Sequence, residues 1–366
     1  MDLNAFFCSC ALIKEPYLKD KVFVVGGSGV TRRGVISTAS YKARKYGIGS
    51  GMNLNDAFER YPKLVVVPTD FKLYRKYSKL FFTYLSKYSD LVLPGSIDEG
   101  YVDMTELSKT KHPLEIAKEI QDGLMKEHQL PCSIGIGPTL FLAKMASDMQ
   151  KPLGITVIRK KDIVNKLFPL PIKEMHGIGK KTYPRLEDIG IKTIGDFTKE
   201  GNKEKILDMM SIQSYESYLD HILGRSNDIV DPDKYSIHQS MSNETTLNYV
   251  MDESDALLKV IDELIEVTYQ RLIKEEYVVK TVGIKLKYQD FKLMTRSFSF
   301  NDYHDDFDRI KNQIHEVFET YYDGEPVRLI GVTFQQVMLK KDLKVDINLF
   351  NYQEFTKREV HLFNKK

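Results

Sequence analysis

A polar, aperiodic stretch beyond the midpoint most constrains how this chain can fold. Residues 225–235 (RSNDIVDPDKY) follow neither a helical nor a strand period, which is typical of a linker between domains. At roughly 100 to 200 residues per domain, a chain of 366 residues is also too long for one domain. We therefore expect separate modules on either side of a linker at residues 227–235.

Strand and helix patterns alternate before this linker. A short strand opens the chain, and strands are expected at 64–67, 91–94 and 132–137, with amphipathic helices at 74–88, 116–130 and 140–149. Such alternation predicts an α/β or α+β core. Residues 159–224 read as helical throughout.

The segment after the linker predicts a second α+β module. Helices are expected at 255–272 and 306–321, and strands at 280–288, 291–300 and 327–337. In the first strand, the alternating side chains of Val282, Ile284 and Leu286 predict one buried face. Lys285 and Lys287 then lie on the opposite face, which would be positively charged.

Composition excludes several classes of protein. Hydrophobic residues make up 42% and charged residues 28%, as in ordinary globular proteins. No apolar run approaches the roughly 18 residues of a membrane span, and the first residues have neither a basic region nor a long apolar one, so we expect a cytoplasmic protein. Cys8, Cys10 and Cys132 suit neither a disulfide framework nor a zinc site and are expected to pack in cores. The formal charge of +2 does not predict a polyanionic partner.

An acidic set indicates phosphoryl-transfer chemistry. Asp2 lies in the opening strand, and Asp98 and Glu99 lie between Gly95 and Gly100, where a turn can break strand alternation and let both carboxylates converge. Mg²⁺ prefers such hard oxygen ligands beside substrate phosphates. The alternative is a solvated turn.

Two further segments could contact phosphate. Residues 37–47 predict a short helix in which Tyr41 and Arg44 share a face and the hydroxyl of Thr38 caps the helix; a solvated basic helix is the alternative. Residues 133–139 (SIGIGPT) lack the lysine of a P-loop. Tight packing of a helix on a sheet is therefore the expected role of Gly135 and Gly137, and the nearby Lys151 could reach a triphosphate.

The segment HGIGKKT at residues 176–182 predicts a helix-hairpin-helix. Gly177 and Gly179 would expose backbone N–H groups to a DNA phosphate, and Lys180 and Lys181 follow at once. A purely structural turn is the alternative.

Together these motifs resemble the Y-family DNA polymerases, in particular the bacterial DinB-like and UmuC-like branch. The resemblance runs from residue 2 to about residue 337 and is most specific in four blocks: residues 2–7 (DLNAFF), 40–47 (SYKARKYG), 96–101 (SIDEGY) and 143–154 (AKMASDMQKPLG). It implies an α+β multidomain fold with the right-hand arrangement of polymerases. The palm would be residues 1–10 and 69–158, the fingers 11–68, the thumb with its helix-hairpin-helix 159–226, the little finger 236–340 and a C-terminal tail 341–366.

The resemblance also assigns roles. Asp2, Asp98 and Glu99, with the Leu3 carbonyl, would hold two Mg²⁺ ions; the dNTP phosphates would be bound by Thr38, Tyr41, Arg44 and Lys151; and Phe7 would be the steric gate against a 2′-hydroxyl. The expected enzyme is a monomeric, cytoplasmic, bacterial DNA-directed DNA polymerase that uses dNTPs and primer–template DNA. Its small fingers would admit distorted templates, which implies error-prone translesion synthesis.

Contacts outside the site are expected from the same resemblance. Lys285 and Lys287 suit duplex-backbone binding. Asp346, Ile347, Asn348, Leu349 and Phe350 loosely resemble a peptide that docks on the replication sliding clamp; a terminal β-segment is the alternative.

The chain departs from the family in two places near its start. Only Met1 precedes Asp2, which predicts a frayed strand end with a charged amine beside the metal ligands, and Asn4 stands where many relatives have Asp. A non-catalytic or truncated DNA-binding paralogue is therefore an alternative. A two-metal nuclease is another, because such nucleases use similar carboxylates.

Overall fold

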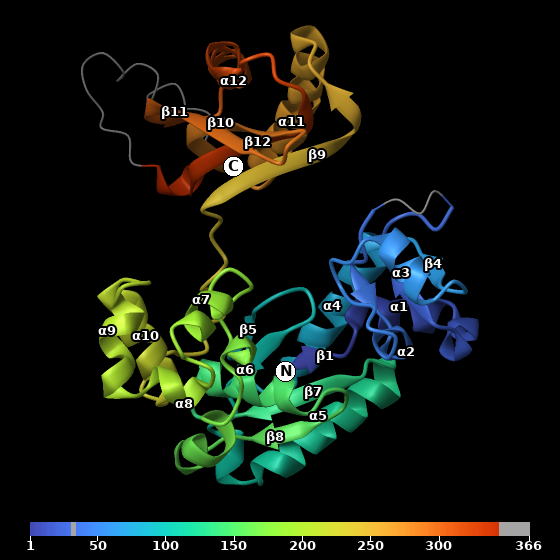
Figure 1. The fold of residues 1–366 in the computed structure, drawn as a ribbon, viewed down its shortest axis with the longest axis vertical. Coiled ribbons are helices and arrows are strands. Elements are labelled where there is room, and N and C mark those ends of the chain that lie inside the picture. Colours follow the sequence, from blue (N-terminus) through green and yellow to red (C-terminus); the bar gives the residue numbers. More distant parts are fainter. Residues whose placement is uncertain (31–33, 344–366) are drawn as a thin grey trace, which may run out of the picture. The chain divides into compact units, whose positions relative to one another are not determined.

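The computed structural model describes residues 1–30 and 34–343, and the chain divides into two compact units between Lys234 and Tyr235 (Figure 1). No helix in the described residues is long and apolar enough to cross a membrane. Each unit has its own hydrophobic core.

The first unit is built around a short mixed sheet. Its strand order is β1 (Asp2–Leu3), β7 (Cys132–Ile136) and β8 (Ile155–Val157), with β1 antiparallel and β8 parallel to β7. The hairpin of β5 (Val92–Pro94) and β6 (Gly100–Val102) joins the free edge of β1 through a bridge between Asp2 and Glu99. This bridge places the acidic turn beside the opening strand.

Helices cover both faces of β7. Cys132 and Ile134 point into a core with α4 (Phe71–Leu85) and α5 (Pro113–His128). Gly135, one residue on, faces α6 (Leu140–Met149), as strand alternation requires. Cys8 and Cys10 lie in the same core as Cys132, as expected, and burial raises the pKa of each of the three thiols to about 12.

A small three-stranded sheet follows β1. Its order is β3 (Thr38–Ala39), β2 (Phe23–Val25) and β4 (Val65–Val67), and the helices around it are α1 (Phe6–Lys14), α2 (Tyr41–Arg44) and α3 (Leu54–Arg60). Val24 faces a local core, while Phe23 and Val25 face the core of the larger sheet. The two sheets are thereby joined by shared side-chain packing.

Residues 159–224 are helical, as expected, and their core includes Leu142 and Met145 of α6. The elements are short turns at Lys160–Asp162, Ile163–Leu167, Ile172–Glu174 and Glu200–Asn202, with α7 (Tyr183–Asp188), α8 (Ile194–Phe197), α9 (Lys203–Leu207) and α10 (Ile212–Ile222). Further 3₁₀ turns are at Pro16–Asp20 and Leu107–Lys109.

The second unit is a four-stranded antiparallel sheet with two helices. The strand order is β11 (Leu293–His304), β10 (Tyr277–Tyr288), β12 (Val327–Leu339) and β9 (Ser240–Met251), and the helices are α11 (Ser254–Lys274) and α12 (Phe307–Tyr321), followed by a 3₁₀ turn at Lys340–Asp342. Val282, Ile284 and Leu286 are buried, as expected. Strand β9 was not predicted, because along its length only Met241 is fully buried and it lacks a strong apolar alternation.

Candidate active site

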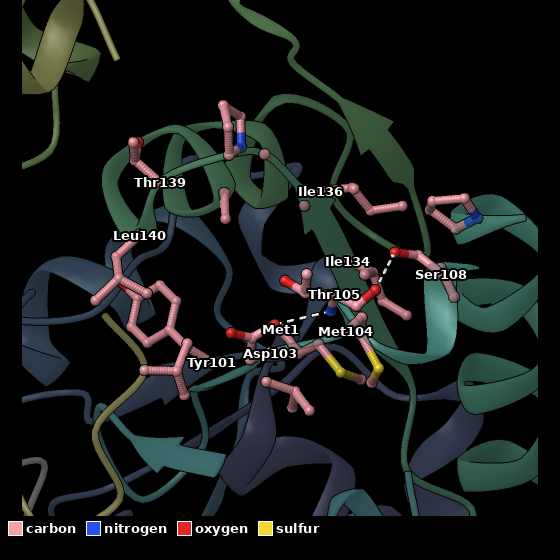
Figure 2. A pocket seen from close by; sticks show the side chains of 18 of the residues that line it. Met1, Tyr101, Asp103, Met104, Thr105, Ser108, Ile134, Ile136, Thr139 and Leu140 are labelled. Atoms are coloured by element: carbon pink, nitrogen blue, oxygen red, sulfur yellow. Dashed lines mark hydrogen bonds between the residues drawn. The ribbon is translucent and has the colours of Figure 1, made fainter. Parts of the chain in front are cut away.

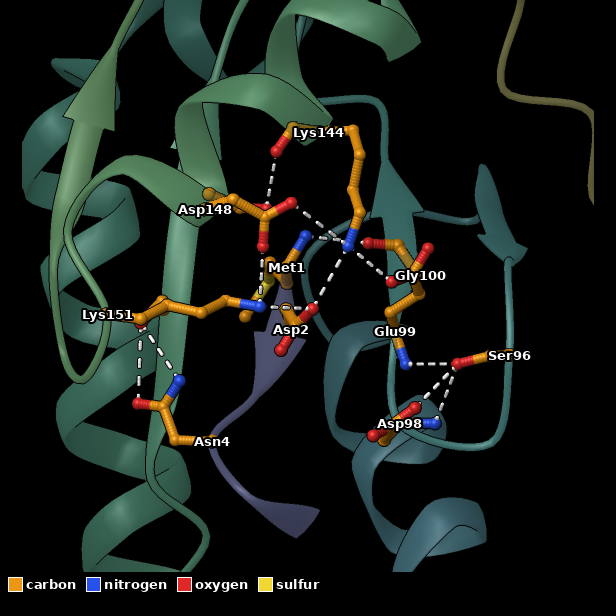
Figure 3. A network of polar contacts seen from close by, with 12 residues as sticks. Met1, Asp2, Asn4, Ser96, Asp98, Glu99, Gly100, Lys144, Asp148 and Lys151 are labelled. Carbon is orange, nitrogen blue, oxygen red and sulfur yellow. Dashed lines mark hydrogen bonds and ion pairs between the residues drawn. The ribbon is translucent and has the colours of Figure 1, made fainter. Parts of the chain in front are cut away.

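The site centres on a facing pair of carboxylates. The Leu3 N–H donates to the Asp98 carbonyl (2.9 Å) and the Gly100 N–H donates to the Met1 carbonyl (3.1 Å). These bonds flank Asp2 and Glu99 and leave them as a non-hydrogen-bonded antiparallel pair, in which facing side chains lie closest. Both carboxylates therefore lie on one face of the sheet (Figure 3).

The strand end is held on both sides. Besides the bridge to Glu99, β1 pairs with β7 at Ser133, and the Met1 ammonium donates to the Gly100 carbonyl (2.8 Å). Burial lowers the pKa of that ammonium. The expectation of a frayed end is therefore wrong, because pairing to two strands fixes Asp2.

Two lysines neutralise the carboxylate pair. Lys144 Nζ lies 3.1 Å from Asp2 Oδ2, 2.5 Å from Glu99 Oε2 and 3.5 Å from Asp148 Oδ2. Lys151 Nζ lies 2.6 Å from Asp2 Oδ2 and 2.7 Å from Asp148 Oδ1. Burial would raise the pKa of Asp2, but the hydrogen bond from Lys151 and the charge of Lys144 hold it below its usual value. Asp2 is thus held ionised by two ammonium groups.

Asp98 lies apart from this pair (Figure 3). Its carboxylate accepts a hydrogen bond from Ser96 Oγ (2.7 Å), and the same hydroxyl accepts the N–H groups of Asp98 (3.2 Å) and Glu99 (3.1 Å). Burial, followed by the negative charges of Asp2 and Glu99, raises the pKa of Asp98. The Asp98 carboxylate is therefore within electrostatic reach of the pair, although its hydrogen bond is to Ser96.

The described residues contain no group of three or more acidic, histidine or cysteine side chains arranged to hold a metal. The expected convergence of Asp2, Asp98 and Glu99 is thus only partly formed, because Asp98 turns toward Ser96. The donors nevertheless suit a hard cation, since the Lys144 ammonium stands between Asp2 and Glu99 as a cation would.

The side chains of Asn4 and Gln121 fix the segment that follows Lys151. Asn4 is buried; its side chain donates to Ser133 Oγ (3.0 Å) and accepts the N–H of Leu153 (2.8 Å). Gln121 donates to the Leu153 carbonyl (2.9 Å). Asn4 therefore serves packing and loop placement where a carboxylate would leave a buried charge.

The phosphate-binding candidates lie on β3 and α2. The side chain that caps α2 is Ser40, whose hydroxyl accepts the Ala43 N–H (3.2 Å); the expectation that Thr38 caps this helix is wrong, because Thr38 lies in β3. Arg44 lies over the Tyr41 ring at 4.7 Å, as expected for residues on one face.

The Tyr41 hydroxyl is buried and has no hydrogen-bond partner within the described part of the chain. Burial raises the pKa of Tyr41, while the charges of Arg44 and Lys151 oppose that rise and the charge of Asp2 adds to it. Tyr41, Arg44, Lys151 and Asp2 are therefore close enough to interact electrostatically. The side chains of α2 thus lie near the carboxylate of Asp2.

Phe7 lies in the first turn of α1, directly after the strand that carries Asp2. Its ring stacks on Tyr74 at 4.1 Å and meets Phe71 edge-on at 6.1 Å. The turn between strand and helix is tight, with Ala5 in the left-handed region at φ 44°. Phe7 is thus braced by aromatic neighbours.

Figure 2 shows the lining of a cavity of about 340 Å³ next to Met1. It is lined by Met1 and by residues of β6 and β7 such as Tyr101, Ile134 and Ile136. Because β1 pairs with both of these strands, the cavity lies along the direction of β1 beyond Met1. Asp2, Asp98 and Glu99 do not line it, so it is distinct from the candidate active site.

The predicted hairpin at residues 176–182 is formed. Gly177 has φ +90°, and its carbonyl accepts the Tyr218 hydroxyl (3.1 Å). Ile178 is buried between the two glycines, whereas Gly179, Lys180 and Lys181 are exposed. The exposed side of the hairpin is thus basic.

Lys285 and Lys287 lie on the predicted face of β10, but the positive charge expected there is offset at Lys285 by an ion pair with Glu244. Lys285 Nζ contacts Glu244 Oε2 (2.6 Å), and Lys287 lies 5.4 Å from the Phe291 ring centroid. Residues 346–350, the candidate clamp peptide, lie outside the described residues.

Sequence reasoning did not single out Lys144 and Asp148 as site residues. They lie four residues apart on α6, and Lys151 follows three residues later. This spacing places the three charged side chains on one side of the helix end. It is the sequence feature that could have identified Lys144 and Asp148 as site residues.

Comparison with known proteins identifies the family. Residues 1–148 match the impB/mucB/samB family, residues 238–349 its C-terminal domain, and residues 160–191 the helix-hairpin-helix motif of the same family. The helix-hairpin-helix expectation is therefore confirmed.

Curated relatives are similar over nearly the whole chain. DNA polymerase IV of Bacillus velezensis is 38% identical, and that of Bacillus cereus is 40% identical; each alignment covers 98% of this chain and 86% of the relative. DNA polymerase IV 1 of Bacillus subtilis is 37% identical over the same shares.

Solved structures share the fold. A Y-family DNA polymerase chimera superposes with a TM-score of 0.82 at 23% identity, and an insertion ternary complex of Dbh DNA polymerase with a TM-score of 0.66 at 24% identity. Both comparisons cover 92% of this chain and 98% of the other. The expected α+β polymerase fold is confirmed, and the chain belongs to the impB/mucB/samB family, the Y-family DNA polymerases, beside bacterial DNA polymerase IV.

Proposed function

We propose that this chain is a template-directed, Mg²⁺-dependent translesion DNA polymerase that adds dNMP to a primer 3′-hydroxyl. Its relatives are named DNA polymerase IV. The observation that carries the proposal is the facing pair of Asp2 and Glu99, held by backbone pairing and already occupied by an ammonium cation.

DNA polymerases of this family depend on metal ions in general, and the donor set here suits Mg²⁺. Asp2, Asp98, Glu99 and the Leu3 carbonyl would hold two ions. When bound, two such ions stabilise the attacking and leaving oxygens of an in-line displacement. The side chain of Asp98 would have to leave Ser96 to join the other two carboxylates.

The residues of α2 and Lys151 would bind the triphosphate. The Tyr41 hydroxyl has a vacant hydrogen-bonding capacity, and Arg44 beside it offers a planar, permanently charged donor set. Thr38 and Lys151 would complete the phosphate contacts. Holding the triphosphate in place lowers the entropic barrier to attack by the primer hydroxyl.

Phe7 would exclude ribonucleotides. Stacking on Tyr74 fixes the ring, so a sugar lying over it could not push it aside to admit a 2′-hydroxyl. Strict positioning of the sugar is compatible with loose checking of the base pair, since the expected fingers comprise only residues 11–68.

DNA contacts are proposed at two places. The exposed hairpin of Gly177, Gly179, Lys180 and Lys181 would bind a backbone phosphate. Lys285 and Lys287 would bind the duplex backbone from the second unit, after Lys285 exchanges its contact with Glu244 for a phosphate. Residues 346–350 would dock on the sliding clamp.

Primer extension with dNTPs and Mg²⁺ on undamaged and abasic templates tests the proposal. Asp98→Asn should reduce extension by a factor on the order of 10²–10³ while primer–template binding persists. Asp90→Asn is the matched control, because Asp90 is exposed and precedes the same hairpin.

Two results would overturn the proposed function, and a third would overturn only the role of Asp98. Intact DNA binding with no extension by the wild type would favour a non-catalytic DNA-binding protein. Metal-dependent hydrolysis of DNA without dNTP would favour a nuclease. Equal extension by wild type and Asp98→Asn would remove Asp98 from the site.

A further inference from the structure

We propose that Lys144 is a positioning residue that acts as a resident cation: it holds Asp2 and Glu99 together in the metal-free site and competes with metal for their oxygens. This inference rests on the proposed function, because it assumes that these carboxylates bind metal. It concerns a residue of α6 outside the predicted ligand set.

The contacts show why a cation is needed at this place. Asp2 and Glu99 face each other across two strands, and their charges would repel if nothing lay between them. The Lys144 ammonium contacts Asp2 Oδ2 at 3.1 Å and Glu99 Oε2 at 2.5 Å. Its side chain is only 12% exposed, so water screens these contacts weakly.

Lys144 also has an alternative ion-pair partner. Asp148, one turn further along α6, has an oxygen 3.5 Å from Lys144 Nζ and is 45% exposed. The ammonium can therefore turn from Asp2 and Glu99 toward Asp148 by rotating its own side chain. Such a rotation leaves the backbone of α6 in place, since Gly135 packs closely beneath that helix.

Sharing of oxygens makes the coupling negative. A metal ion bound by Asp2 and Glu99 would use the oxygens that Lys144 now contacts, so each cation weakens the binding of the other. By linkage the two effects are equal in size. Lys144 thereby offsets the repulsion between the two carboxylates when no metal is bound, and it lowers their affinity for metal.

The experiment measures Mn²⁺ binding to the full-length chain by calorimetry and electron paramagnetic resonance, without DNA or dNTP. Lys144→Met should bind Mn²⁺ at least about tenfold more tightly than wild type, because a competing charge is lost. Asp148→Asn should bind it several-fold more weakly, because Lys144 loses its alternative partner. Lys118→Met is the control, since Lys118 pairs with Asp122 four residues later on α5.

A thermal readout separates this role from plain structural support. In EDTA the Tm of Lys144→Met should fall below that of wild type, and saturating Mn²⁺ should restore it. A fall that Mn²⁺ does not reverse, together with unchanged Mn²⁺ affinity, would overturn the inference. If Lys144→Met does not fold, unchanged Mn²⁺ affinity in Asp148→Asn overturns it.

The same titrations distinguish the two levels of proposal. Saturable Mn²⁺ binding that is lost in Asp98→Asn but equal in wild type and Lys144→Met would overturn this inference and leave the proposed metal site standing. No saturable binding by any variant would overturn the metal site, and the inference with it.

Discussion

Gly135→Ala is predicted to dislodge the helix that carries Lys144. A Cβ at position 135 would collide with the carbonyl oxygen of Ala143 and lie 2.9 Å from the Cβ of Ala146. Neither atom can rotate away, because one is backbone and the other is the first atom of a short side chain. The structure thus confirms that this glycine serves helix-on-sheet packing.

The size of the effect follows from the contacts. Adding atoms to a packed core typically lowers the free energy of unfolding by about 1 to 3 kcal/mol, and a collision with backbone places Gly135→Ala near the upper end. For the first unit, Met1–Lys234, about 3 kcal/mol corresponds to a Tm lower by roughly 6 to 12 °C. Primer extension should fall as well, because α6 positions Lys144 against Asp2.

Thermal and urea unfolding of the full chain check this reasoning. Gly201→Ala is the matched control, because a Cβ at that position meets nothing within 4 Å; its effect should stay within about 0.5 kcal/mol. If Gly135→Ala and Gly201→Ala unfolded alike, the close approach of α6 to β7 would not be a real constraint and the argument would fail.

Three further predictions concern other parts of the chain. The hydrogen bond from Lys199 and backbone N–H groups lower the pKa of Asp196 to about 2. The stabilising contribution of the ionised carboxylate is therefore present above about pH 4 and is lost as pH falls toward 2. Asp196→Asn should lower the free energy of unfolding by about 1 kcal/mol at pH 7, and equal stabilities in urea at that pH would contradict this. Phe7→Ala should increase rNMP incorporation relative to dNMP in single-nucleotide assays, whereas unchanged discrimination in an active enzyme would refute the steric gate. Replacing Lys180 and Lys181 by Ala should reduce the salt dependence of primer–template binding, log K against log salt, by roughly 1.8; an unchanged slope would place the hairpin away from DNA.

Local patterns predicted most of the fold. Helix α6 has the bounds expected from sequence, Leu140–Met149, because capping by Thr139 and a continuous apolar face define it locally. The alternation of Val282, Ile284 and Leu286 likewise identified a strand and its buried face. Strand β9 was not predicted because its own sequence lacks a strong apolar alternation, and the strand is formed by pairing with β12.

The candidate site was predicted as a set of residue types and not as a geometry. Asp2, Glu99 and Lys144 come from three distant segments, and the first and the last are 142 positions apart in the sequence. Their meeting depends on the register of β1 against β6 and β7, and a shift of one residue would turn Asp2 to the other face. No local pattern encodes that register.

The position of Asp98 shows what register alone cannot decide. Strand pairing ends at Glu99, so Asp98 belongs to the turn, and its side chain follows the local hydrogen bond to Ser96 rather than the alternation of the strand. Burial and two neighbouring carboxylates raise its pKa, which means that repulsion opposes its approach to Asp2 and Glu99. A cation is what would reverse that balance, and Lys144 reaches only two of the three carboxylates. The arrangement is therefore that of a site in which a resident cation holds one pair of ligands, while the third remains with a local partner until a further cation draws it in.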